Sequence, residues 1–242
     1  MADEVMLERH EGWAELILNR PETRNAINGP FGMLLAEHAR AINEDPTINA
    51  VLLRGAGGAF CSGLDLKAFN AEPPPSWHVD FPLLWRSAHK ALFQMQAALV
   101  VAVEKYAING GAALALAGDF MVMGDEAFLH VGEVQQGMSA PYNLAWLRFR
   151  HSEALTARVA LLGERIAGTD AVALGLATRS VANEGVLEVA QELTQKLASY
   201  PQGAPAHVKA VSRAYSEEQA DRWFDRAFAL GPAPSQRPRA ND

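Results

Sequence analysis

A repeated alternation of short apolar strands with helical segments constrains the fold of this chain more than any other feature. In chain order, the strand-like runs and the segments with helical spacing are 14–18, 31–43, 50–54, 83–95, 99–103, 110–117 and 120–123. This order predicts an α/β core in which right-handed crossovers join the strands. From residue 144 onward the pattern is mostly helical. We therefore expect a core at 1–185 and an appended helical region at 186–242.

The composition and charge exclude several classes of protein. A chain of 242 residues that is 49% hydrophobic can bury a sizeable core. Its net charge of −7 argues against a general nucleic-acid binder, because that role needs a basic face. The sequence has one cysteine, no His/Cys cluster with zinc spacing, no basic leader segment and no apolar run of about 18 residues. We expect a cytoplasmic protein with no nucleic-acid partner, no membrane segment and no bound metal.

Two small-residue turns follow apolar strands and precede short helical segments. One contains GAFCSGLDL, after the strand at 50–54, and the other contains INGGAALALAGD, after the strand at 99–103. In such turns, free backbone N–H groups lie at a helix N-terminus, where the helix dipole favours negative charge. Two turns brought together would form an oxyanion hole. Each turn alone is more often a place of close packing in an α/β fold.

Four segments have an order and spacing that match a known family: LNRPETRNAIN, GAGGAFCSGLDL, GGAALALAGDF and LLGERIAGTDAVALGLATRSV. Together they resemble the crotonase superfamily of enoyl-CoA hydratases and isomerases, over nearly the whole chain. The resemblance implies an α/β fold of the ClpP/crotonase type, a spiral of ββα units whose helical C-terminal region builds a homotrimer or a dimer of trimers. It also implies an acyl-CoA substrate, whose thioester enolate two backbone N–H groups stabilise, and no cofactor besides the coenzyme A of that substrate.

The resemblance assigns the two oxyanion donors. The family's first donor is the residue after the glycine of the turn, which is Leu64 here. Asp119 matches the aspartate that closes the family's helix, and counting back from it puts the second donor at Gly110. The same count places a Glu-Lys pair at 104–105 where the family has Asn-Gly, which is a departure. Gly110 and Gly111 still provide the required absence of a Cβ.

The resemblance also points to the proton-transfer group. Hydratases of the family use two glutamates, and this chain has Ala113 at the first position and Glu133 at the second. One carboxylate can still move a proton between two carbons of an enolisable thioester, as the family's 3-enoyl to 2-enoyl isomerases are thought to do. The apolar neighbours Val131, Val134 and Met138 are expected to raise the pKa of Glu133 toward about 6 to 7. Without the resemblance, an exposed loop acid would be the preferred interpretation.

Further residues are expected to contact the CoA thioester. Arg24 resembles the family's basic contact to the CoA phosphates, with a solvated connector arginine as an equal alternative. Asp65 and Lys67 are expected to position the turn and to lie beside the adenine or pantetheine, and His130 could reach the pocket or be a packed structural residue. The expected substrate-binding set is Arg24, Ala26, Ser62, Asp65, Leu66, Lys67, Gly111 and His130.

Several alternatives stay open. The loop at 71–82 contains three consecutive prolines and is a candidate flap, in which Trp77 and His78 either line the acyl channel or lie on the surface. Enoyl-CoA isomerisation is the first function, and hydration, decarboxylation, thioester hydrolysis or CoA binding without chemistry are the alternatives. Large apolar residues in the helical segment at 207–230 predict an oligomer.

Overall fold

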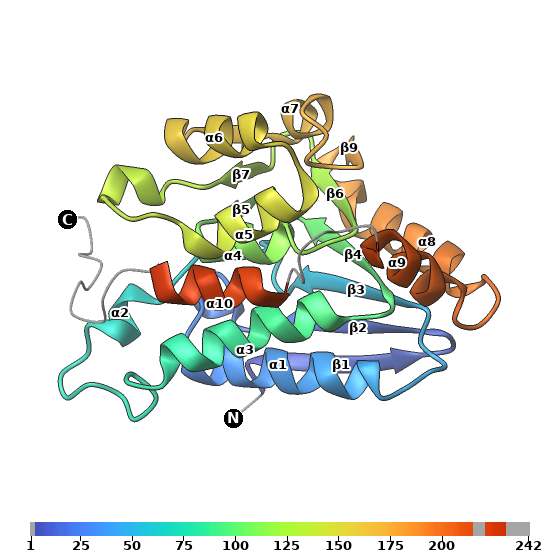
Figure 1. Cartoon of the computed structure of the whole chain (residues 1–242), viewed down its shortest axis with the longest axis horizontal. Coiled ribbons are helices and arrows are strands. Elements are labelled where there is room, and N and C mark those ends of the chain that lie inside the picture. The colour runs from blue at the N-terminus through green and yellow to red at the C-terminus, as the bar shows by residue number, and fades with distance from the viewer. Residues whose placement is uncertain (1–2, 215–220, 231–242) are drawn as a thin grey trace.

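The structure, a computed structural model, describes residues 3–214 and 221–230, and its largest feature is a six-stranded sheet (Figure 1). The strand order is β1-β2-β3-β4-β6-β9; β1 is antiparallel to β2, and every other neighbouring pair is parallel. The strands are β1 Val5–His10, β2 Trp13–Leu18, β3 Ala50–Gly55, β4 Ala98–Val103, β6 Phe120–Gly124 and β9 Arg179–Val181. The predicted strands all belong to this sheet.

A second sheet of three short strands lies beside the first. Its order is β5-β7-β8, with β5 parallel to β7 and β7 antiparallel to β8. The strands are β5 Tyr106–Ile108, β7 Phe128–His130 and β8 Arg165–Ala167. Thus β4 and β6 are each followed at once by a strand of the small sheet, and then by helical turns. The chain after residue 144 is mostly helical, as expected, with the short strands β8 and β9 as exceptions.

The helices surround the main sheet. The longer ones are α1 Gly29–Asn43, α3 Phe81–Gln94, α5 Pro141–Arg150, α6 Glu153–Leu162, α8 Val186–Ala198, α9 Ala204–Ala214 and α10 Asp221–Leu230. The short ones are η1 Pro21–Thr23, α2 Leu66–Phe69, α4 Gly110–Ala115, η2 Glu133–Gln136, α7 Gly168–Ala173 and η3 Asn183–Gly185. The helix expected from residue 31 begins two residues earlier, because the Asn28 side chain accepts a hydrogen bond from the Phe31 N–H (2.9 Å) and caps it.

The two faces of the main sheet are buried under different helices. Leu52 and Val100 face α8, whereas Leu53 and Val101 belong to the larger core that contains residues of α1, α3 and α4. Successive side chains of a strand point to opposite faces, so neighbours in sequence enter different cores. Because both faces are covered, β3 and β4 are apolar at nearly every position.

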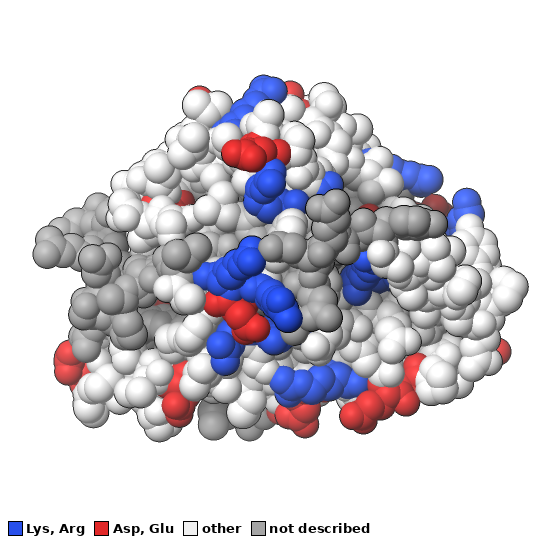
Figure 2. All heavy atoms as spheres, viewed as in Figure 1, with Lys and Arg blue, Asp and Glu red and all other residues white. Residues whose placement is uncertain are grey.

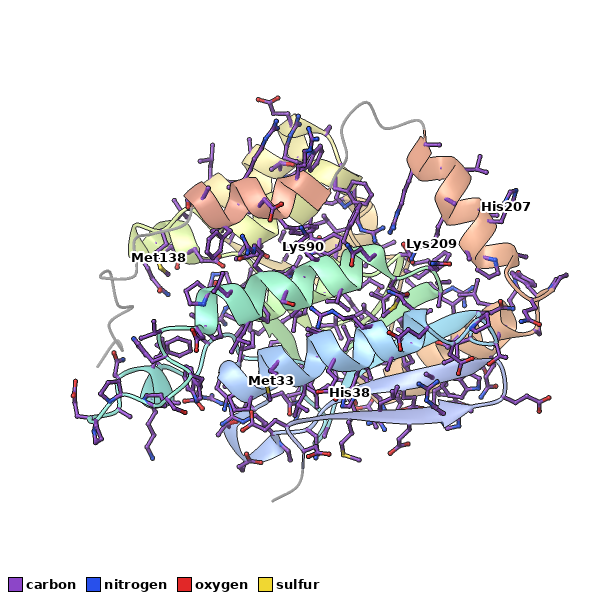
Figure 3. All side chains as sticks on the ribbon, turned by 60° about the horizontal axis from the view of Figure 1, so that its bottom comes forward. Met33, His38, Lys90, Met138, His207 and Lys209 are labelled. Carbon is purple, nitrogen blue, oxygen red and sulfur yellow. The ribbon has the colours of Figure 1, made fainter. Side chains whose placement is uncertain are left out.

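The C-terminal helices pack against the rest of the chain. Lys209 projects from α9 toward the body of the protein (Figure 3), where its Nζ donates to Asp119 Oδ2 (2.6 Å). In α10, Phe224 is 1% exposed and its ring lies 4.7 Å from that of Trp146. Val208 and Val211 of α9 remain exposed.

Part of the apolar surface that we expected at a subunit interface is therefore used inside the chain. The oligomeric state stays a prediction. The segments 215–220 and 231–242 of the expected helical region lie outside the described residues. Within the described ranges, no helix is both long enough and apolar enough to cross a membrane.

Candidate active site

The turn after β3 presents one free backbone N–H group. Gly63 has a φ of +91°, a conformation that favours glycine, and a Cβ there would lie 3.0 Å from the Ile108 carbonyl oxygen. The Ile27 N–H donates to the Gly63 carbonyl (2.8 Å), and the Asp65 N–H donates to the Ile27 carbonyl (2.9 Å). These bonds lie on either side of Leu64, whose own N–H has no acceptor among the described residues.

Asp65 holds this turn from the helix side. Its Oδ1 accepts a hydrogen bond from the Ala68 N–H (2.9 Å), which caps α2, and its Oδ2 pairs with Arg20 at 2.9 Å. Both carboxylate oxygens of Asp65 are therefore bound to other residues of the chain. The structure thus gives Asp65 a role in shaping the turn and places its side chain away from solvent.

The turn before α4 presents a second free N–H group. Asn109 has unusual dihedral angles of φ 50° and ψ −110°, and its N–H donates to the His130 carbonyl (2.7 Å). Gly110 then begins the helix, and its N–H has no acceptor within the described ranges. A Cβ at Gly110 would lie 3.0 Å from Ile27 Cδ1, and one at Gly111 would lie 2.6 Å from the Cys61 carbonyl oxygen. The close packing of the two turns therefore needs the glycine at 111, where a Cβ would collide with backbone, whereas a Cβ at 110 would press on the end of the Ile27 side chain.

The pair at 104–105 keeps the left-handed backbone without a glycine. Lys105 stands where the resemblance implies glycine, and its φ is 55°. The Glu104 carbonyl accepts from the Phe60 N–H (3.1 Å), and the Lys105 carbonyl accepts from the Phe128 N–H (3.0 Å). These bonds hold the segment between the two sheets, so the departure leaves the path toward Gly110 intact.

A cavity of about 780 Å³ lies where the two turns meet. Leu64 and Gly110 line it, together with Ala113 and Glu133. Most of the remaining wall is apolar and comes from α2, α3, β5, α5, α10 and the loop before α5: Leu66, Phe81, Pro82, Trp85, Ile108, Met138, Ala140, Pro141, Tyr142, Ala227, Phe228 and Ala229. Glu133 is the one carboxylate among the described lining residues.

Glu133 is a buried acid with one oxygen left free. The residue is 8% exposed, and burial raises the pKa of its carboxyl to about 7, within the expected range. The backbone N–H of Glu133 and the Asn143 side chain, whose Nδ2 donates to Glu133 Oε1 (2.8 Å), act in the opposite direction on the pKa. Glu133 Oε2 is buried and has no hydrogen-bond partner among the described residues. Such a carboxyl can accept and release a proton near neutral pH.

Other predicted contact residues surround the first turn. Ser62 and Leu66 line the cavity. Arg24 and Lys67 are exposed near them, and the Ser62 N–H donates to the Arg24 carbonyl (3.1 Å). Both cations therefore remain accessible to a ligand that approaches the cavity along this turn.

Three further predicted contact residues are not among the described residues that line the cavity. Ala26 is 6% exposed, and Gly111 packs against Cys61. The His130 ring points elsewhere: its Nε2 lies 3.0 Å from the Gly163 carbonyl oxygen, and His130 is not among the described lining residues. The structure thus gives His130 the packed, hydrogen-bonded place that was its alternative.

Residues 71–80 of the expected loop pack beside the cavity without lining it, whereas Phe81 and Pro82, expected in the loop, begin α3 and do line it. Trp77 covers Gly29, where a Cβ would lie 2.3 Å from Trp77 Cγ. Phe69 makes edge contacts with Trp77 (5.0 Å between ring centroids) and with Phe81 (4.6 Å). His78 lies 5.8 Å from the Phe69 ring. Phe81 is the member of this cluster that lines the cavity, and Trp77 and His78 contact the cavity wall only through the ring cluster.

Charged side chains gather over α3 and α10 on the face that Figure 2 shows. Arg86 and Lys90 of α3 lie 3.6 and 3.3 Å from Asp225 of α10. The Arg86 guanidinium also lies 4.3 Å from the centre of the Phe228 ring, which lines the cavity. These contacts fasten α10 over the site. The described residues contain no cluster of three His, Cys, Asp or Glu side chains that could hold a metal ion.

The parallel main sheet, the small second sheet and the paired glycine turns define a crotonase fold. An enoyl-CoA hydratase/isomerase from Mycobacterium paratuberculosis superimposes with a TM-score of 0.84 at 26% identity, over 96% of this chain and 93% of that one. An enoyl-CoA hydratase from Mycobacterium tuberculosis H37Rv superimposes with a TM-score of 0.77 at 28% identity, over 95% and 89%.

This chain belongs to the enoyl-CoA hydratase/isomerase family, whose sequence model matches residues 8–228, and it is an acyl-CoA enzyme of the crotonase superfamily. It is 29% identical to the 1,2-epoxyphenylacetyl-CoA isomerase of Escherichia coli K12, over 83% of this chain and 78% of that protein. It is 31% identical to the carnitinyl-CoA dehydratase of Proteus mirabilis, over 84% and 77%.

Proposed function

We propose that this protein is an enoyl-CoA isomerase that moves a double bond from the 3 to the 2 position of an acyl thioester, with Glu133 as its proton shuttle. One observation carries the proposal: a buried carboxyl with a pKa raised to about 7 and two free backbone N–H groups line the same cavity. The donors suit an anionic oxygen, and the carboxyl suits proton transfer near neutral pH.

In this reaction the thioester oxygen accepts hydrogen bonds from the N–H groups of Leu64 and Gly110. Ionised Glu133 takes a proton from C2 of the 3-enoyl thioester. The electron pair of the broken C–H bond delocalises into the carbonyl, and the negative charge of the resulting dienolate rests on the oxygen between the two donors. Glu133 then returns the proton to C4. The double bond ends between C2 and C3, and the carboxylate is regenerated.

The rest of the substrate would follow the first turn. In this proposal Arg24 and Lys67 meet the CoA phosphates, Ser62 and Leu66 contact the pantetheine arm, and the apolar wall of the cavity holds the acyl group. The coenzyme A belongs to the substrate, and no further cofactor is needed for the proton transfer. A homotrimer or a dimer of trimers is the assembly that the resemblance implies.

Hydration or dehydration is the second candidate, since the carnitinyl-CoA dehydratases are among the similar proteins. Adding water across a double bond needs a group to activate the water and a group to deliver a proton. Ala113 is fully buried in the cavity wall at the position where the family's hydratases have a glutamate. Isomerisation is preferred because one carboxyl is sufficient for it.

The test is to assay Glu133→Gln on 3-enoyl-CoA and 2-enoyl-CoA thioesters. The substitution keeps the shape of the side chain and both backbone donors, so ligand affinity should change little. Turnover of 3-enoyl-CoA should fall about 10²- to 10⁴-fold, as is typical when a general base is removed. Ala113→Glu should add hydration of 2-enoyl-CoA. Unchanged turnover in Glu133→Gln would overturn the proposal, and efficient hydration by the wild-type protein would favour the second candidate.

A further inference from the structure

Asn143 connects the two halves of the candidate site. Its side chain is 2% exposed and lies on the first turn of α5, ten residues after Glu133. The Nδ2 group donates to Glu133 Oε1 (2.8 Å) and also to the carbonyl oxygen of Asn109 (3.1 Å). Asn109 is the residue that directly precedes the Gly110 donor. One amide group therefore contacts both the carboxyl and the backbone that carries an oxyanion donor.

The chemistry of this contact requires an amide nitrogen. Both acceptors are oxygen atoms, and the NH₂ group of asparagine supplies two hydrogens, one for each. With the amide turned over, Asn143 Oδ1 would face two oxygen atoms and repel both. The Oδ1 atom is buried and without a partner among the described residues, so its position is not set by a bond of its own. The orientation follows from the two acceptors.

The same contact makes the two oxygens of Glu133 unequal. Oε1 is held by Asn143, whereas Oε2 is buried and has no partner among the described residues. A carboxyl that is fixed through one oxygen holds the other oxygen in one orientation. The reacting oxygen is then already positioned for proton transfer before the substrate binds. Together with the backbone N–H of Glu133, this hydrogen bond from Asn143 to the ionised form opposes the effect of burial, so the carboxyl remains partly ionised near neutral pH.

We propose that Asn143 is a positioning residue, which fixes Glu133 through Oε1, leaves Oε2 to carry the proton, and holds this oxygen in register with the Gly110 donor. The inference rests on the proposed function of Glu133 as the proton shuttle. It gives Asn143 a role in the reaction although its amide does not exchange a proton with the substrate.

The experiment measures the ionisation of Glu133 directly and compares it with the pH dependence of turnover. The protein is labelled with ¹³C-glutamate, and the δ-carbon resonance that is missing in Glu133→Gln identifies Glu133. In Asn143→Leu, which is similar in size, the pKa of Glu133 should rise by about 1 or more, because a hydrogen bond to the charged form is lost. The acidic limb of kcat/KM should move to higher pH by the same amount, and kcat should fall while KM changes little.

Two further variants keep the test decisive. Asn143→Asp has nearly the shape of asparagine, and its carboxylate beside Glu133 should raise the apparent pKa values of the pair and move the acidic limb the same way. Asn49→Leu is the matched control: Asn49 is buried, its Nδ2 donates to the Tyr200 carbonyl (2.8 Å), and it lies just before β3, at the end opposite the cavity turn. It should lower the stability of the protein and leave the pKa of Glu133 unchanged.

The outcomes separate the two proposals. If Glu133→Gln is inactive but neither Asn143 variant moves the pKa of Glu133 or the acidic limb, the positioning role is overturned and the proton shuttle stands. If Glu133→Gln turns over as fast as the wild-type protein, the proposed function fails and the role of Asn143 fails with it. A change of the Glu133 resonance in Asn49→Leu equal to that in Asn143→Leu would also overturn the inference, because it would mark a general loss of structure.

Discussion

At the level of single residues, the site places a carboxyl where burial opposes its ionisation. Glu133 is buried among apolar lining residues, its Oε1 accepts one hydrogen bond from Asn143, and its pKa is raised to about 7. A pKa near the working pH favours proton transfer, because the group is then neither permanently protonated nor permanently charged. The same rise of the pKa lowers the free energy of unfolding at pH values above the ordinary pKa of glutamate.

The energetic cost of this placement can be measured with Glu133→Gln. The unfolded carboxyl titrates near 4.5 and the folded one near 7, so the folded state binds more protons between these values. The free energy of unfolding of the wild-type protein should therefore fall, relative to the variant, as pH rises from 4.5 to 7 and stay level above. The variant should be more stable by about 3 kcal/mol at pH 8 and by much less at pH 4. Denaturant titrations at the two pH values check this, and an equal difference at both would contradict it.

At the level of elements, the contact of the proline-rich loop with α1 supports one wall of the cavity. The loop at 70–80 folds Trp77 over Gly29, and the ring cluster of Phe69, Trp77 and Phe81 connects this contact to the cavity wall. The packing of the loop on α1 therefore helps to fix the position of Phe81 in the cavity wall, although none of these residues belongs to the two glycine turns. The glycine is needed because the tryptophan ring occupies the space of a Cβ.

Two glycines of α1 provide a matched comparison for this contact. A Cβ at Gly29 would lie 2.3 Å from Trp77 Cγ, whereas a Cβ at Gly32 would have its nearest neighbour at 3.7 Å, the Leu84 carbonyl carbon. Gly29→Ala should lower the free energy of unfolding by about 1 to 3 kcal/mol and speed proteolysis within 70–80, because Trp77 must move. Gly32→Ala should be neutral or stabilise by up to about 1 kcal/mol through helix propensity. Equal effects of both variants would show that Trp77 does not depend on Gly29.

For the whole molecule, α10 completes a core that the earlier elements leave open. His89 of α3 lies at the centre, fully buried: Trp146 Nε1 donates to its Nδ1 (2.9 Å), Tyr142 stacks on its ring (4.6 Å), and Phe224 of α10 lies 5.9 Å away. The next turn of α10 contributes Phe228 to the cavity. The site is therefore closed by the last described helix, and its closure depends on a core that contains a neutral histidine.

This histidine should make the fold sensitive to acid. Burial lowers the pKa of His89 to about 3 from 6.5, so between these values the unfolded state binds a proton that the folded state does not. The free energy of unfolding should fall by about 2 to 3 kcal/mol from this group as pH drops from 7 to 4.5. In His89→Gln, whose amide oxygen can still accept from Trp146, this part of the loss should disappear. Urea titrations across that pH range check the prediction. The same dependence of the free energy of unfolding on pH in the wild-type protein and in His89→Gln would contradict it.

Strands β2, β3, β4 and β6 of the main sheet were predicted from apolar runs of the sequence, whereas the role proposed for Glu133 came from the resemblance to the family. Runs such as 50–54 and 99–103 are apolar because both faces of the sheet are covered, and the glycine turns keep their residue types because a Cβ would collide. The three-residue strands β5, β7, β8 and β9 were missed, since so short a segment shows no periodicity.

The contact between Glu133 and Asn143, the seat of Trp77 on Gly29 and the position of α10 over the cavity could not be predicted. Each joins residues through packing that no local pattern encodes: Asn143 lies 34 residues from Asn109, and Phe224 lies still farther from His89 along the chain. The apolar neighbours of Glu133 in sequence indicated its raised pKa, but the helices that bury it were known only from the structure. The sequence by itself specifies which ionisable groups are present. Burial and the pairing of distant side chains arise only when the helices pack on the sheets, and these two factors set the free energy of ionising each group.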